Sequence, residues 1–187
     1  MAFNKDYILE KIADTEDGEH SFSDLMTKEG MPEDVPEEMK KMIDMVGNVV
    51  SIDYVDLGED SYDAYGLYSF VPDDPDDPSA HLSVVMTLTD HLNPIGMTSL
   101  YQIVNRINAR IPIGAFAVSE DETTLFYRNS IQIHKELGDD AAADVTAIGV
   151  LQSLVIVTEW IDVLMGLNDG TLVFEECIER TKVTAEV

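Results

Sequence analysis

Apolar and polar residues follow two different periods along this chain, and the change of period divides it into helical and extended segments. Helical spacing is clearest where Leu100, Ile103, Val104 and Ile107 fall on one face. The helical pattern predicts helices over residues 5–13, 37–46, 94–111 and 139–166, with a shorter one near 172–179. Val-, Tyr- and Leu-rich stretches with partial alternation predict strands over residues 49–57, 62–71, 82–88, 113–118 and 123–131.

Proline, glycine and asparagine mark the ends of these segments. Pro36 suits the first turn of the helix at 37–46, and Gly47 is a natural stop for it. Asn93 and Pro94 open the next helix as cap and first residue, and Pro112 ends it.

The resulting order is α-βββ-α-ββ-α, in which strands and helices do not alternate regularly. It predicts an α+β fold with an antiparallel sheet of about five strands and helices mainly on one face. We expect residues 1–187 to form a single domain with its core in 37–167. Residues 1–36 are a less defined N-terminal extension, with a short helix or strand around Phe22, Leu25 and Met26.

The chain is strongly acidic, with a formal net charge of -26, yet 45% of its residues are apolar, as in a globular protein. Nucleic acids and anionic membranes are poor partners, because binding them requires clustered Lys and Arg. Basic or apolar protein segments, or cations, fit this charge. Solubility or a salty cell interior explains the same charge without any partner.

The single cysteine, Cys177, excludes an intramolecular disulfide framework, and the N-terminus has no apolar signal core. We therefore expect a cytoplasmic protein. Residues 145–167 are apolar enough to imitate a membrane span, but they contain Glu159 and Asp162, which are costly inside a bilayer. The segment is interpreted as a helix buried in a soluble core.

Candidate chemistry is sparse. The sequence has no phosphate-binding glycine loop, nucleophile elbow or zinc-protease motif, and its four histidines are scattered. The acidic loop at residues 73–77 offers carboxylates to calcium but lacks the EF-hand glycine and distal glutamate. We expect no catalytic residues, no cofactor and no metal, and therefore no enzyme.

Residues 100–108 (LYQIVNRIN), with Asn105 and Asn108, resemble the central helix of the YbjN-like family, also called bacterial sensory transduction regulators. The resemblance continues through residues 112–118 (PIGAFAV), the acidic turn at 119–122 and the strand at 125–128. Glu122 and Thr123 stand where the family usually has Gly after the acidic pair. The family is similar in fold to type III secretion chaperones, which implies a homodimer with a non-enzymatic binding role.

The first hypothesis is a cytoplasmic regulatory or chaperone-like protein that binds another protein, one that is basic or partly unfolded. The alternatives are a small-ligand or cation-dependent enzyme that uses carboxylates, and an acidic nucleic-acid mimic. Sheet edges and apolar patches are the expected contacts. On the strand at 62–71 the partner-binding candidates are Tyr65, Tyr68 and Phe70. Core packing is the default interpretation of the face that carries Tyr68 and Phe70, and Tyr65 lies on the opposite face.

Overall fold

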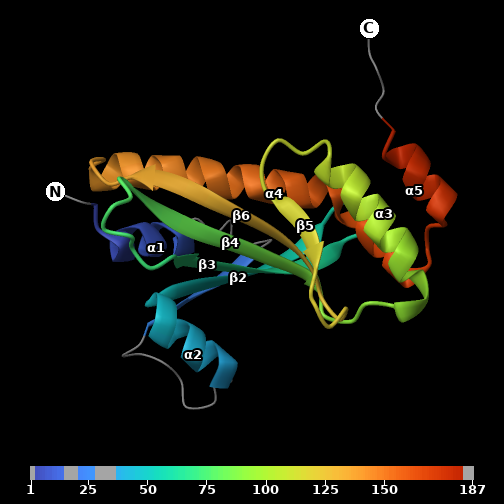
Figure 1. The fold of residues 1–187 in the computed structure, drawn as a ribbon, viewed down its shortest axis with the longest axis horizontal. Helices are drawn as coiled ribbons and strands as arrows, with labels where there is room; N and C mark the ends of the chain where they lie inside the picture. Colours follow the sequence, from blue (N-terminus) through green and yellow to red (C-terminus); the bar gives the residue numbers. More distant parts are fainter. Residues whose placement is uncertain (1–2, 15–20, 28–36, 183–187) are drawn as a thin grey trace, which may run out of the picture.

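The computed structural model describes residues 3–14, 21–27 and 37–182, which form one antiparallel sheet of six strands together with five α-helices (Figure 1). The strands lie in the order β1-β2-β3-β4-β6-β5. Their bounds are β1 Ser21–Met26, β2 Val49–Leu57, β3 Tyr62–Phe70, β4 Ser79–Thr89, β5 Ala115–Val118 and β6 Leu125–His134. The predicted α+β class and antiparallel sheet are confirmed.

The helices are α1 Lys5–Ala13, α2 Glu37–Val46, α3 Met97–Asn108, α4 Asp139–Asp169 and α5 Phe174–Arg180. α4 crosses the sheet and contacts β3, β4 and β6, while α1 and α3 pack beside its two ends. α5 contacts α3 and α4. Figure 1 shows α2 apart from these four, below the sheet.

The sheet has six strands, whereas the sequence predicts about five. The additional strand lies in a segment whose pattern fits either a short helix or a strand. The segment around Phe22, Leu25 and Met26 forms β1, which pairs with β2 along its whole length. α1 buries Ile8, Leu9 and Ile12 in the same core as the sheet. These two elements are therefore integral to the fold, whereas residues 15–20 and 28–36 lie outside the described part of the chain.

The hydrophobic core lies between α1, α3, α4 and one face of the sheet, because alternate strand residues point toward these helices. On β3 and β4 the inward residues are buried, whereas their neighbours in sequence are half-buried on the outer face. Two buried residues, Ile43 of α2 and Val49, lie outside this core, since Val49 precedes the inward-pointing Val50 and faces outward.

The side chain of Asn108, the last residue of α3, covers the free edge of β5. Its carboxamide donates to the carbonyl of Phe116 at 2.8 Å and accepts from the amide of Phe116 at 2.8 Å. Asn108 thus takes the place of a neighbouring strand at the middle of β5. A sheet edge with its backbone groups paired in this way cannot easily add a strand.

Among the described helices, only α4 is long and apolar enough to cross a membrane, and one third of its apolar window (33%) is buried inside the fold. The side of α4 that faces the sheet carries small residues: Ala142, Thr146, Gly149 and Ser153 are buried there. A Cβ on Gly149 would lie 2.6 Å from Ile131 Cδ1, so the absence of a side chain lets α4 approach β6 closely.

Candidate functional site

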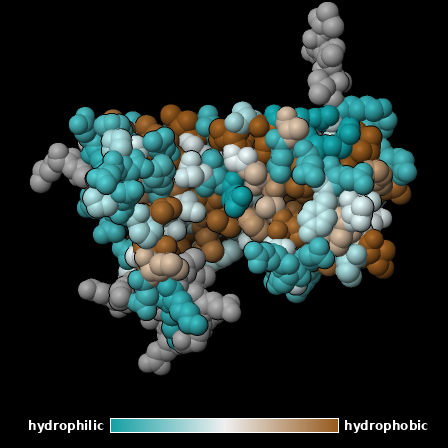
Figure 2. Space-filling model, viewed as in Figure 1, coloured by the Kyte–Doolittle hydropathy of each residue, from teal (hydrophilic) through white to brown (hydrophobic). Residues whose placement is uncertain are grey.

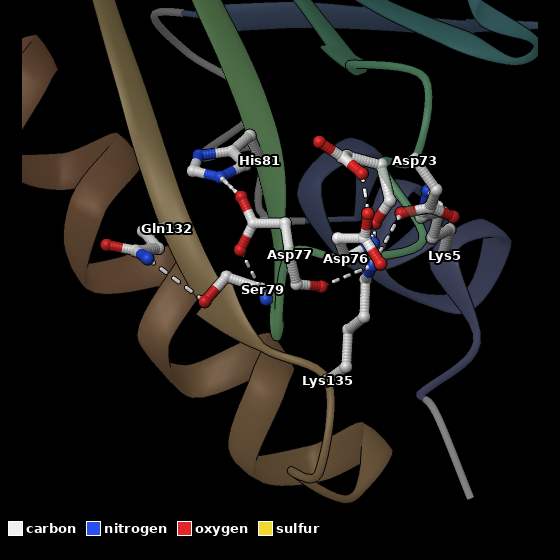
Figure 3. A network of polar contacts seen from close by, with 9 residues as sticks. Lys5, Asp73, Asp76, Asp77, Ser79, His81, Gln132 and Lys135 are labelled. Carbon is white, nitrogen blue, oxygen red and sulfur yellow. Dashed lines mark hydrogen bonds and ion pairs between the residues drawn. The ribbon is translucent and has the colours of Figure 1, made fainter.

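The acidic loop between β3 and β4 is built around a lysine of the protein itself (Figure 3). Lys135 Nζ donates to the backbone carbonyls of Asp74 and Asp77 at 3.0 and 2.8 Å and lies 3.7 Å from the Asp73 carboxylate. Lys5 of α1 approaches the same Asp73 at 2.8 Å. The two ammonium groups thus bring positive charge to this acidic loop.

Two further carboxylates of this loop, those of Asp74 and Asp77, also accept hydrogen bonds. Asp77 accepts from the amide of Ser79 at 2.8 Å and lies 2.9 Å from His81 Nε2. The hydrogen bond with His81 lowers the pKa of Asp77, and the one from Lys5 lowers the pKa of Asp73. Both carboxylates thus favour the folded state above their ordinary pKa, and this contribution is lost as the pH falls through the lowered values. Among the described residues, no group of three or more His, Cys, Asp or Glu side chains is placed to hold a metal ion.

Replacing Lys135 with methionine should destabilise the fold, because two carbonyl oxygens and a carboxylate of an acidic loop lose their cation. Hydrogen bonds to charged groups contribute about 1.5–3 kcal/mol, and partial exposure of Lys135 sets the expected loss at about 1–2 kcal/mol. Urea unfolding followed by circular dichroism measures it. Lys182→Met is the matched control, since Lys182 pairs with Glu179 at an exposed helix end. Equal losses in both variants would contradict the role given to Lys135.

Of the three residues predicted to bind a partner, two lie in the core. Tyr68 and Phe70 are buried, and the Tyr68 hydroxyl lies 2.7 Å from that of Tyr54. They point toward the helices because they share the inward face of β3, so a partner cannot reach them in this fold. Tyr65 points to the outer face, where it is half-buried and partial burial raises its pKa.

The largest group of exposed aliphatic side chains lies on the outer side of α4. Val145, Ile148, Leu151 and Val155 are 38, 58, 60 and 62% exposed, and we call these four residues the α4 ridge. They recur at intervals of three, three and four residues, so they form one stripe along the helix. Figure 2 shows hydrophobic side chains along the upper edge of the molecule, where α4 runs.

A hollow of about 460 Å³ lies on the α1 side of this ridge. α1 contributes Ile8 and Ile12 to it, and Tyr54 of β2 lies among its walls. From α4 it is lined by Ala143, Asp144, Ala147, Val150, Leu151 and Leu154. Burial raises the pKa of Tyr54, and its hydroxyl is paired with Tyr68, so this hollow is an apolar surface rather than a reactive one.

A second hollow, of about 320 Å³, lies on the opposite side of the ridge. It lies between α4 and β6, where Asn129, Ser130 and Ile131 meet Ile148 and Gln152. The α4 ridge therefore stands between two hollows. Ridges and grooves of this kind are the features by which helices pack against one another.

The prediction that residues 145–167 are buried in the core is confirmed for residues 161–166, of which Ile161, Val163, Leu164, Met165 and Gly166 are buried. Over residues 145–155 it is correct for only one side of α4. The sequence holds a signal for the exposed side: small residues recur on the inner face of residues 142–153, and large aliphatics recur on the outer face. Mean apolarity hides this arrangement, because small and large apolar residues both count as hydrophobic. A helical projection that separates residues by size would have found the ridge.

Comparison of the chain with protein-family models, with curated proteins and with solved structures gave no match. The resemblance to the YbjN-like family therefore stays a prediction.

Proposed function

We propose that this protein is a non-enzymatic, cytoplasmic regulatory or chaperone-like protein that acts by binding another protein through the surface of α4. The observation that carries the proposal is the α4 ridge. A soluble monomer rarely leaves a contiguous aliphatic stripe exposed between hollows, and such surfaces mark interaction sites. The acidity of the rest of the protein adds selectivity for a basic partner.

The arrangement of the acidic loop also supports a binding role over carboxylate chemistry. The Asp73 carboxylate, which the sequence offers for cation binding, pairs with both Lys5 and Lys135, and Lys135 also donates to the carbonyls of Asp74 and Asp77. These contacts tie α1 and the turn before α4 to the loop. Asn4 and Tyr7 add hydrogen bonds to Asp139 and Asp140. These contacts hold α1 against α4, which preserves the hollow between them.

A glutamate in place of Leu151 should remove partner binding. The protein would be immobilised and exposed to a lysate of its source cells, and each captured protein would be quantified for wild type and variants. A charge buried in an apolar contact should reduce recovery of the specific partner by about tenfold or more. Because Leu151 is exposed, the variant should unfold at the same temperature as wild type.

Two further variants give this experiment its controls. Ile95 is 94% exposed and lies near the C-terminal end of α4, where Asn93 bonds to Asn168, and therefore away from the α4 ridge, so Ile95→Glu should leave recovery unchanged. Tyr65→Glu tests the outer face of the sheet; a loss seen there and not with Leu151→Glu would move the site to that face. Equal recovery with all variants, or no specific protein, would contradict the proposal.

A further inference from the structure

We propose that the partner docks on the α4 ridge as an amphipathic helix whose aliphatic stripe is bracketed by Lys or Arg at both ends. This inference rests on the proposed function and specifies the conformation and charge of the partner. Three features carry it: the hydrogen-bonding state of α4, the hollows beside the ridge, and the carboxylates at the ends of the ridge.

The backbone of α4 favours a helical occupant. An extended segment lying on an apolar surface leaves its own N–H and C=O groups without partners, which is unfavourable unless a sheet edge receives them. The ridge lies along a helix whose own backbone groups bond within the helix. A helical partner satisfies its backbone internally and needs only apolar contact from α4.

The hollows give this helix a place to pack. A helix laid along α4 would set its aliphatic side chains beside the ridge, and those at its two margins would enter the hollows on either side. The larger hollow, between α1 and α4, is lined by Ile8, Ile12 and Leu154 and accepts the bulkier side chains. The ridge from Val145 to Val155 spans about 15 Å, or nearly three helical turns.

Charge determines what the ends of the partner must carry. Residues 145–158 contain no charged side chain, whereas Asp144 and Glu159 stand at the two ends of this stretch, about 22 Å apart. Both are exposed, and neither forms an ion pair with the described residues. A second copy of this chain would place carboxylate against carboxylate in either orientation, but a helix with basic ends complements both.

Three labelled peptides of about 16 residues test this inference on the full-length protein. The first carries Leu at helical spacing over a background of Ala and Gln, with two Lys at each end. The second replaces the terminal Lys with Glu, and the third keeps Lys but carries two central prolines that prevent a helix. Fluorescence anisotropy measures binding, and circular dichroism reports helix formation.

We expect the first peptide to bind at least about tenfold more tightly than either of the others, with a difference from the second peptide that shrinks in salt. Leu151→Glu should remove this binding, and Ile95→Glu should not. Equal binding of the first and second peptides would contradict the requirement for basic ends. Equal binding of the first and third peptides would contradict a helical partner. No binding of any peptide overturns the inference as a whole.

These outcomes are separable from the proposed function. If the peptides fail but Leu151→Glu still abolishes capture of a cellular protein, the α4 ridge is a protein-binding surface whose partner has another form. Sedimentation velocity tests whether the protein forms a dimer through the α4 ridge. A dimer that Leu151→Glu dissociates would assign the ridge to a second copy and overturn the basic-helix partner.

Discussion

Replacing Gly114 with alanine should destabilise the protein by about 2–5 kcal/mol, the largest effect that we expect from a single methyl group. Gly114 has a φ of +66°, in the left-handed region where a side chain is strained. A Cβ there would lie 2.2 Å from the Tyr127 hydroxyl and 2.7 Å from the carbonyl oxygen of Arg128. The contact with the backbone carbonyl cannot be relieved by a rotamer change.

Tyr127 cannot move away from this clash at low cost. It is fully buried, its ring lies 5.2 Å from that of Phe116, and its hydroxyl donates to the carbonyl of Ile113 at 3.2 Å. The added methyl group must therefore shift β6 or the turn that enters β5. A loss of this size is a large part of the 5–15 kcal/mol that typically stabilises a domain.

Urea unfolding followed by the fluorescence of Trp160, the single tryptophan, measures this loss. Gly47→Ala is the matched control: Gly47 has a φ of +87°, but its added Cβ would have nothing within 4 Å. Gly47→Ala should lower the free energy of unfolding only through the strain of a side chain at positive φ, by about 1–2 kcal/mol. If Gly114→Ala were no worse than Gly47→Ala, the crowding inferred around Tyr127 would be incorrect.

Replacing Asn108 with leucine should cost about 2–4 kcal/mol, because it leaves both the N–H and the C=O of Phe116 without a partner. Phe116 is buried, so water replaces the carboxamide poorly. The freed edge of β5 should also make the variant more prone to associate, since unpaired strand edges recruit other strands. Urea unfolding and sedimentation velocity measure the two effects.

Asn105→Leu provides the comparison on the same helix, because Asn105 is exposed there. A surface substitution of this kind should change the unfolding free energy by less than about 0.5 kcal/mol. The protection of the β5 edge by Asn108 would be refuted if the two variants lost the same stability, or if Asn108→Leu remained fully stable.

Local pattern was enough to predict most of the elements. The helix predicted over residues 5–13 is α1, and the strand predicted over 49–57 is β2. The helix predicted over 94–111 begins instead with the 3₁₀ turn Pro94–Gly96, followed by α3, Met97–Asn108. Such boundaries depend on caps and neighbours, which period alone does not encode.

The candidate surface was harder to predict than the fold. The sequence predicts Tyr68 and Phe70 as partner contacts, but alternation places them on the face of β3 that α4 and its neighbours cover. The sequence predicts that residues 145–167, which include the α4 ridge, lie in the core, because a strongly apolar helix usually packs on all sides. Which apolar face stays uncovered depends on how many elements surround it, and that number is a property of the packed fold.

The class of fold, the acidity and most of the helices and strands can be predicted without a structure, since they follow from local periodicity and composition. Three features become visible only in the packed fold: the strand order β1-β2-β3-β4-β6-β5, the pairing of Lys5 and Lys135 with the acidic loop, and the exposure of the α4 ridge. These features join residues far apart in the chain. The contacts that stabilise these features form only when the chain is folded. In the folded chain, the small inner residues of α4 pack against β6, and its large aliphatic residues remain on the outside.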